Sequence, residues 1–240
     1  MSENKQAIET VLNQEVVGTT LPTAFEVYTK KLFGEERYNV FCKGLQQPSP
    51  VSIRLNPFKT GETTKVADSF APTPVAWCKE GFYLNARPNF TFDPLFHAGT
   101  YYVQEASSMF LSHILRCLVS KPVALLDLCA APGGKTAIAE GSIVFSNEPI
   151  NKRAQILAEN VQKFGHSDVV VTNNYPRDYK KTKLAFDVVV TDVPCSGEGM
   201  FRKDPQAIAE WSEQNVANCW QLQRTIIADI WDNLKPGGLL

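Results

Sequence analysis

The sequence lacks the features that would mark a membrane or secreted protein. Its 240 residues contain no apolar run near the roughly 20 residues that cross a bilayer. The first residues, Met-Ser-Glu-Asn-Lys, also lack the apolar segment of a secretory signal peptide. These absences predict a cytoplasmic protein that has no membrane partner.

Metal-ligand pairs and an excess of positive charge are missing as well. The six cysteines include no CxxC pair and the three histidines are dispersed, so we expect reduced thiols and no metal site. The net charge of −1 gives no basic footprint of the kind that most nucleic-acid-binding proteins carry. Any contact with RNA must therefore come from a local patch, or from a part of the protein outside these 240 residues. The oligomeric state is left open.

What the sequence does contain is an alternation of apolar runs and helical patterns in its second half. A helix is expected from about Met109 to Val119, and the pattern then predicts strands at 124–128, 143–146, 169–172 and 187–191, with helices at 152–164 and 211–233. Such alternation is typical of an α/β fold, in which helices cover both faces of a parallel sheet.

The first half is organised differently. Residues 1–20 are polar and weakly patterned, and are expected to form a flexible lead-in. Residues 21–98 predict a small α+β domain, with two amphipathic helices that break near Gly34 and several short strands. The α/β domain is expected over 99–240. Apolar residues after Pro236-Gly-Gly indicate the start of a further strand at the chain's end, so we expect a C-terminally truncated chain.

A glycine-rich turn follows the first strand of the α/β domain. Gly134-Lys135-Thr136 is similar to the end of a P-loop, but that motif needs glycine where Cys129 stands, which leaves an NTPase as a weak alternative. Glu148 ends the next strand and is placed to accept hydrogen bonds from ribose hydroxyls. The pattern therefore favours a nucleoside cofactor, with a structural turn as the competing interpretation. Lys135 is expected to meet a carboxylate on the ligand.

A second junction carries Asp192-Val-Pro194-Cys195. Methylation of an exocyclic amine would call for an aromatic residue where Cys195 stands. A cysteine instead suits attack at carbon 5 of cytosine, which becomes nucleophilic after a thiolate adds to carbon 6. An adjacent acid that engages the ring nitrogen would favour that adduct. The competing interpretation is a buried structural thiol.

These motifs together resemble the Sun-type RNA cytosine-5 methyltransferases, particularly the bacterial ribosomal-RNA enzymes. The resemblance covers residues 21–240 and is carried by 52–56, 102–107, 125–136, 147–149, 192–197 with Arg202 and Pro205, and 234–238. It implies a Rossmann-like S-adenosylmethionine-dependent methyltransferase fold with an N-terminal RNA-binding-type domain. It also implies methylation of carbon 5 of cytosine in RNA, and the RNA that it indicates is ribosomal RNA.

The resemblance implies site residues by position. Asp192 and Lys135 would orient the target cytosine, and Cys195 would assist release of the product. S-adenosylmethionine would be bound by Cys129, Ala130, Ala131, Pro132, Gly133, Gly134, Lys135, Glu148, Arg153, Asn174, Asp192 and Pro194. Arg54 and Arg202 are the arginines that we expect to contact RNA phosphates.

The sequence departs from the family pattern in three places. The Thr-Cys pair that holds the family's nucleophile does not occur. Only 12 residues separate Lys135 from Glu148, so the intervening helix can hardly exceed two turns. Asn174 stands near the place of an acid and would have to bind the adenine amino group. A non-catalytic RNA-binding or ribosome-assembly module that retains the fold is therefore the alternative function.

Overall fold

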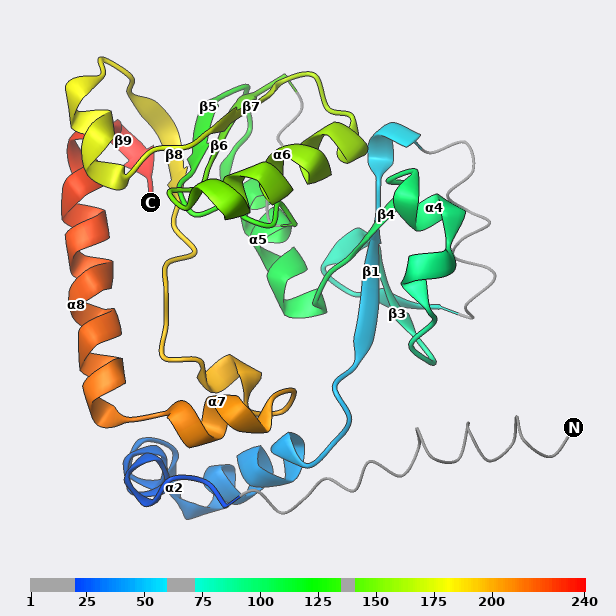
Figure 1. The fold of residues 1–240 in the computed structure, drawn as a ribbon, viewed down its shortest axis with the longest axis vertical. Helices are drawn as coiled ribbons and strands as arrows, with labels where there is room; N and C mark the ends of the chain where they lie inside the picture. The colour runs from blue at the N-terminus through cyan, green and yellow to red at the C-terminus, as the bar shows by residue number, and fades with distance from the viewer. Residues whose placement is uncertain (1–19, 60–71, 135–140) are drawn as a thin grey trace, which may run out of the picture. The chain divides into compact units, whose positions relative to one another are not determined.

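A computed structural model of the chain describes residues 20–59, 72–134 and 141–240 (Figure 1). Within these ranges no helix is long and apolar enough to cross a membrane. The chain divides into two compact units. The first comprises the residues up to Ser49 together with Pro194–Leu222, and the second comprises Pro50–Val193 and Gln223–Leu240. The expected lead-in at 1–20, apart from its last residue, and the expected short helix after Lys135 lie outside the described residues.

The first unit is helical. Helix α2 spans Thr23–Leu45 and is interrupted at Gly34, whose φ of 76° lies in the left-handed region that glycine adopts without strain, so the predicted break is confirmed. The unit also contains η4 (Glu198–Met200), α7 (Pro205–Glu210) and the first part of α8 (Glu213–Ile230). Its core is a cluster of Phe25, Phe201 and Ile208.

The second unit begins with an antiparallel sheet whose strand order is β2-β3-β1-β4. These strands are β1 (Val51–Leu55), β2 (Thr73–Val75), β3 (Cys78–Leu84) and β4 (Tyr101–Val103). The short elements η1 (Pro57–Lys59), η2 (Phe90–Phe92) and α4 (Pro94–His97) connect them. The sheet has its own core around the fully buried Ile53, and the expected short strands are present in it. The domain bounds 21–98 stay a prediction.

The α/β part of this unit contains a five-stranded sheet of order β7-β6-β5-β8-β9, in which all neighbours are parallel. The strands are β5 (Ala124–Asp127), β6 (Ile143–Asn147), β7 (Val169–Thr172), β8 (Phe186–Val190) and β9 (Leu234–Leu239). The first four agree with the predicted strands to within one residue at each end. The remaining elements are α5 (Ala106–Leu118), α6 (Asn151–Phe164), η3 (Pro176–Lys181) and η5 (Trp231–Asn233).

Helices pack on both faces of this sheet, as the alternation predicted (Figure 1). Side chains of a strand alternate between faces, so neighbouring residues of β5 join different cores. Leu126 packs with Ile226 and Ile230 of α8, whereas Leu125 packs with Leu115 of α5. The fold is therefore Rossmann-like, and the carboxyl ends of β5, β6 and β8 meet at one edge.

The last strand corrects one expectation. Pro236, Gly237 and Gly238 lie inside β9, which begins at Leu234, whereas the sequence predicted a strand that starts after them. Proline is tolerated here because β9 is an edge strand. Gly237 has a φ of 78°, and the pairing with β8 is irregular between Phe186 and Val188.

Candidate active site

Three carboxylates gather at the carboxyl edge of the parallel sheet. Asp127 ends β5, Glu148 follows β6 directly, and Asp192 follows β8. The thiol of Cys129 lies close enough to all three carboxylates for their negative charges to act on it. Burial raises the pKa of the Cys129 thiol to about 11, and the negative charges of Glu148, Asp127 and Asp192 act in the same direction. This thiol is therefore protonated at neutral pH, and it is a poor nucleophile.

The glycine-rich turn over this edge is held by contacts from several elements. The backbone N–H of Ala130 donates to the carbonyl of Asn147 (2.8 Å), and the N–H of Gly133 donates to the carbonyl of Ala130 (2.7 Å). The amide of Asn160 in α6 donates to the carbonyl of Pro132 (2.7 Å). Gly133 has a φ of 106°, which only glycine adopts readily. The described part of the turn is thus a fixed structure.

The antiparallel sheet also holds this turn. The side-chain amide of Gln104, just after β4, donates to the carbonyl of Gly134. A Cβ atom on Gly134 would lie 2.5 Å from Cε1 of Tyr102, so only glycine allows the turn to approach β4 this closely. Ser52 in β1 fixes Gln104 in turn, because its hydroxyl donates to the Gln104 carbonyl (2.6 Å).

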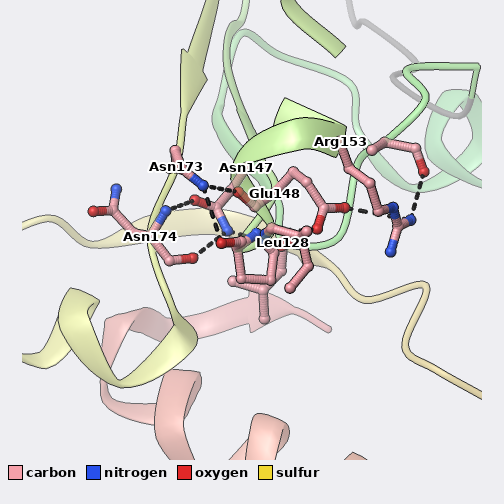
Figure 2. Close-up of polar contacts among 9 residues, drawn as sticks. Leu128, Asn147, Glu148, Arg153, Asn173 and Asn174 are labelled. Carbon is pink, nitrogen blue, oxygen red and sulfur yellow. Dashed lines mark hydrogen bonds and ion pairs between the residues drawn. The ribbon is translucent and has the colours of Figure 1, made fainter. Parts of the chain in front are cut away.

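Glu148 is almost completely buried, with 1% of its surface exposed. Its Oε1 accepts a hydrogen bond from the N–H of Ile150 (3.0 Å), and its Oε2 forms an ion pair with Nη2 of Arg153 (3.4 Å). The same Nη2 donates to the carbonyl of Ala131 (3.3 Å), so Arg153 links the acid to the turn (Figure 2). Among the described residues Oε2 has no hydrogen bond, which leaves it able to accept one from a ligand hydroxyl.

Beside Glu148 lies Asn147, a residue to which the sequence assigned no role. It is fully buried, and its amide nitrogen donates to the carbonyls of Leu128 (3.0 Å) and Asn174 (2.9 Å). Its Oδ1 accepts from the N–H of Asn174 and faces the hydroxyls of Thr172 and Tyr179, all at 3.0–3.1 Å. Figure 2 shows its contacts with Leu128 and Asn174, so Asn147, the last residue of β6, joins the segments that follow β5 and β7.

The two asparagines after β7 differ in what they do. Asn173 donates from its side chain to the carbonyls of Glu148 (2.6 Å) and Pro149 (3.1 Å), a contact that the sequence did not indicate. Asn174, which was expected to bind adenine, contacts Asn147 through its backbone, and its side chain points away from Asn147 (Figure 2). Its exposed side chain is available to a ligand, and the adenine contact stays a prediction.

Other predicted residues lie elsewhere. Pro194 and Cys195 belong to the first unit, where the Cys195 thiol is exposed, and Asp192 belongs to the second. Arg202 is exposed in the first unit, and Arg54 is half-buried in β1 of the second. Lys135 lies outside the described residues. Among the residues described, no cluster of histidine, cysteine or acidic side chains could hold a metal ion.

Solved structures define the class of protein to which this fold belongs. The chain aligns with a methyltransferase homologue from Pyrococcus horikoshii at a TM-score of 0.70 and 25% identity, covering 86% of this chain and 68% of the other. The structure of NSun6 from the same organism with SFG gives a TM-score of 0.77 at 18% identity, covering 91% and 82%. The fold is that of a Rossmann-like methyltransferase.

Sequence families narrow the class. Residues 119–240 match the family model described as 16S rRNA methyltransferase RsmB/F, and residues 21–106 match the N-terminal domain of 16S rRNA methyltransferase RsmF. The chain therefore belongs to the RsmB/F methyltransferase family, as the resemblance implied.

Curated relatives agree with this assignment. The ribosomal RNA small subunit methyltransferase F of Pectobacterium atrosepticum is 36% identical over 217 residues, covering 83% of this chain and 44% of its own length. The protein of the same name from Serratia proteamaculans is 34% identical over 237 residues, covering 92% and 49%. The chain spans about half the length of the curated relatives that it matches.

Proposed function

We propose that this chain takes part in methylation of carbon 5 of cytosine in ribosomal RNA, with S-adenosylmethionine as methyl donor. The observation that carries the proposal is the gathering of Asp127, Glu148 and Asp192 around Cys129, under the glycine-rich turn of a chain in the RsmB/F family. The relatives' names supply the RNA substrate. A cytoplasmic location belongs to the same proposal, because that is where a bacterial cell keeps its ribosomal RNA.

The residues of this edge fit such a cofactor. Oε2 of Glu148 has acceptor capacity to spare, and a ribose hydroxyl would use it. Three carboxylates also favour a ligand that carries positive charge, and S-adenosylmethionine has a sulfonium and an ammonium group. The same three charges would repel a triphosphate, which argues against the NTPase alternative. When bound, the cofactor would supply an electrophilic methyl group.

The chain's own residues would then act on the base. Asp192 would engage the ring nitrogen of the cytosine through a shared proton, assisted by Lys135, and Cys195 would assist elimination after methyl transfer. The base must first leave its stack to reach this edge. Addition to carbon 6 needs a thiolate, and Cys129 is unsuited because its pKa is raised to about 11. The nucleophile is expected in a Thr-Cys pair, which these 240 residues do not contain.

Binding of the reaction product S-adenosylhomocysteine tests the cofactor site directly. Isothermal titration calorimetry should show binding to the chain, and Glu148→Gln should weaken it at least about tenfold, because a hydrogen bond to a charged acceptor is lost. Glutamine keeps the Oε1 atom that accepts from Ile150, so the fold should survive. Glu159→Gln, an exposed change on α6, is the matched control and should leave affinity unchanged.

A folded protein that gives no heat with S-adenosylhomocysteine would contradict the proposal and favour the non-catalytic RNA-binding module.

Transfer of tritiated methyl groups to unmodified small-subunit ribosomal RNA tests the roles of the cysteines. The 240-residue chain should turn over poorly. Rapid turnover that is lost in Cys195→Ser would show instead that Cys195 is the nucleophile.

A further inference from the structure

A groove of about 660 Å³ lies in the second unit, away from the carboxylates. Residues 119–122, which precede β5, form part of its wall, and so does His166, which precedes β7. Because β5 and β7 are parallel, these segments lie at the amino edge of the sheet, opposite the edge that carries Asp127 and Glu148. The rest of the wall comes from the antiparallel sheet and from α5.

Positive charge is concentrated in this groove. Its lining includes four cations and a single carboxylate, namely Arg54, Lys79, Arg116, Lys121 and Glu80. Glu80 is shared, because Arg116 lies 3.3 Å and Lys79 lies 3.5 Å from its two oxygens. Burial alone would raise the pKa of Glu80, but a backbone hydrogen bond and these cations, with Arg54, lower it. A net charge of about three is therefore left uncompensated, in a chain whose total is −1.

Arg54 lies deepest among these cations. Burial lowers the pKa of its guanidinium, and its Nε has no hydrogen-bond partner among the described residues. Arg54 and His166 also line a smaller cavity beneath Gly133 and Gly134 of the glycine-rich turn. A buried donor that lacks an acceptor costs free energy, and a ligand oxygen entering the groove would satisfy it.

An aromatic pair forms another part of the lining. The rings of Phe58 and His166 lie 4.3 Å apart and edge to face, and half of the Phe58 side chain is exposed. Cations that follow a groove together with an exposed ring are the elements with which proteins bind single-stranded nucleic acid, because phosphates meet the cations and a base stacks on the ring. A small closed anion pocket would need no such ring.

We propose that this groove binds a single-stranded segment of the RNA substrate through its phosphodiester backbone, at the edge of the sheet opposite the methyl-transfer site. The inference rests on the proposed function for the nature of the substrate. Arg116 and Lys121 are exposed and meet phosphates, Arg54 supplies the deep donor, and Phe58 stacks on a base. The groove is thus a local basic patch in a chain that is near neutral overall.

Fluorescence anisotropy with a fluorescein-labelled oligouridylate of twelve nucleotides tests the groove. The variant Arg116→Gln with Lys121→Gln should weaken binding about 20-fold at 0.1 M salt and reduce the salt slope by about 1.4, because two single-strand phosphate contacts are lost. Phe58→Ala should weaken binding at least about fivefold. The control Lys181→Gln with Lys183→Gln removes equal charge from exposed positions outside the groove and should change affinity less than about twofold.

Each outcome separates this inference from the proposed function. If the groove variant binds the oligonucleotide as the control does, while S-adenosylhomocysteine still binds both, the groove is not an RNA site and the proposed function stands. If inorganic phosphate binds the groove with loss in the groove variant, and the oligonucleotide does not bind, the groove is a small-anion site and the inference is wrong. A wild-type chain that binds neither ribosomal RNA nor S-adenosylhomocysteine would contradict both.

Discussion

At the scale of single residues, Asn147 shows how one buried amide can organise the candidate site. Its two amide hydrogens meet two backbone carbonyls, and its oxygen faces three donors, so its hydrogen-bonding capacity is fully used. Glu148, the expected ribose acceptor, is the next residue in the chain. The orientation of that carboxylate therefore depends on a neighbour that touches no ligand in our proposal.

Asn147→Asp should destabilise the protein by about 3 kcal/mol, because two buried carbonyls lose their donors and face a carboxylate. The pKa of such an aspartate would be raised above its unfolded value, so the loss of stability should be smaller at pH 5 than at pH 8. Urea unfolding at the two pH values measures this. Asn151→Asp, at the exposed start of α6, is the control and should cost less than about 1 kcal/mol, because it loses only an exposed hydrogen bond to Asn173 (3.3 Å). Equal midpoints for the two variants would contradict the assigned role of Asn147.

Sequence reasoning identified Glu148 and the turn at 129–134, because an acid and a glycine-rich stretch after apolar runs are local patterns. It included Asn147 in the 147–149 motif but could not assign it a role, because its partners lie 19 to 32 residues away and are partly backbone carbonyls. Tyr102 and Gln104 were noted only as part of a motif. Their contact with Gly134 depends on how the antiparallel sheet meets the turn, which no local pattern encodes.

At the scale of elements, the contact between β4 and the glycine-rich turn joins the antiparallel sheet to the candidate cofactor site. Gly134→Ala would place a methyl group 2.5 Å from the Tyr102 ring, so the turn or the ring must shift. We expect a stability loss of about 1–3 kcal/mol and at least about tenfold weaker S-adenosylhomocysteine binding. Calorimetry and thermal unfolding measure the two effects.

The second variant, Gly134→Ala with Tyr102→Ala, should recover part of the affinity, because the obstructing ring is gone. Gly199→Ala is the control, since a Cβ atom there would meet nothing within 4 Å. If Gly134→Ala binds as the wild type does, the turn adapts freely, and its position is not set by β4.

Strands and helices were predictable where hydrophobic patterns are strong. Strands β5 to β8 agree to within one residue at each end, and the break at Gly34 lies where a glycine interrupts two helical patterns. The strand orders β2-β3-β1-β4 and β7-β6-β5-β8-β9 could not be predicted, because pairing depends on contacts between distant segments. The limits of β9 were wrong, since Pro236-Gly-Gly has the composition of a turn but lies in an edge strand.

At the scale of the whole molecule, the chain combines two units, and the first is built from segments far apart in the sequence. Phe25 of α2 packs against Phe201 (5.1 Å between ring centroids) and Trp211 (5.4 Å). Its side chain is 6% exposed. The sequence pattern showed only that this phenylalanine lies on an apolar helix face. Where its partners are was not predictable, and the predicted boundary between domains at residue 98 stays a prediction.

Phe25→Ala should test whether the two units unfold separately. Removing this buried ring leaves a cavity that costs about 3–5 kcal/mol. Hydrogen exchange followed by mass spectrometry should show faster exchange in α2, η4 and α7, while β5, β6 and β8 of the second unit keep their protection. Val27→Ala, on the same helix but 64% exposed, is the control and should leave all of these rates unchanged.

S-adenosylhomocysteine should bind the Phe25 variant as well as it binds the wild type, because every residue of the carboxylate edge belongs to the second unit. Equal loss of protection in both units would show instead that they fold as one cooperative body, and Cys195 in the first unit would then depend on the sheet that carries Asp192.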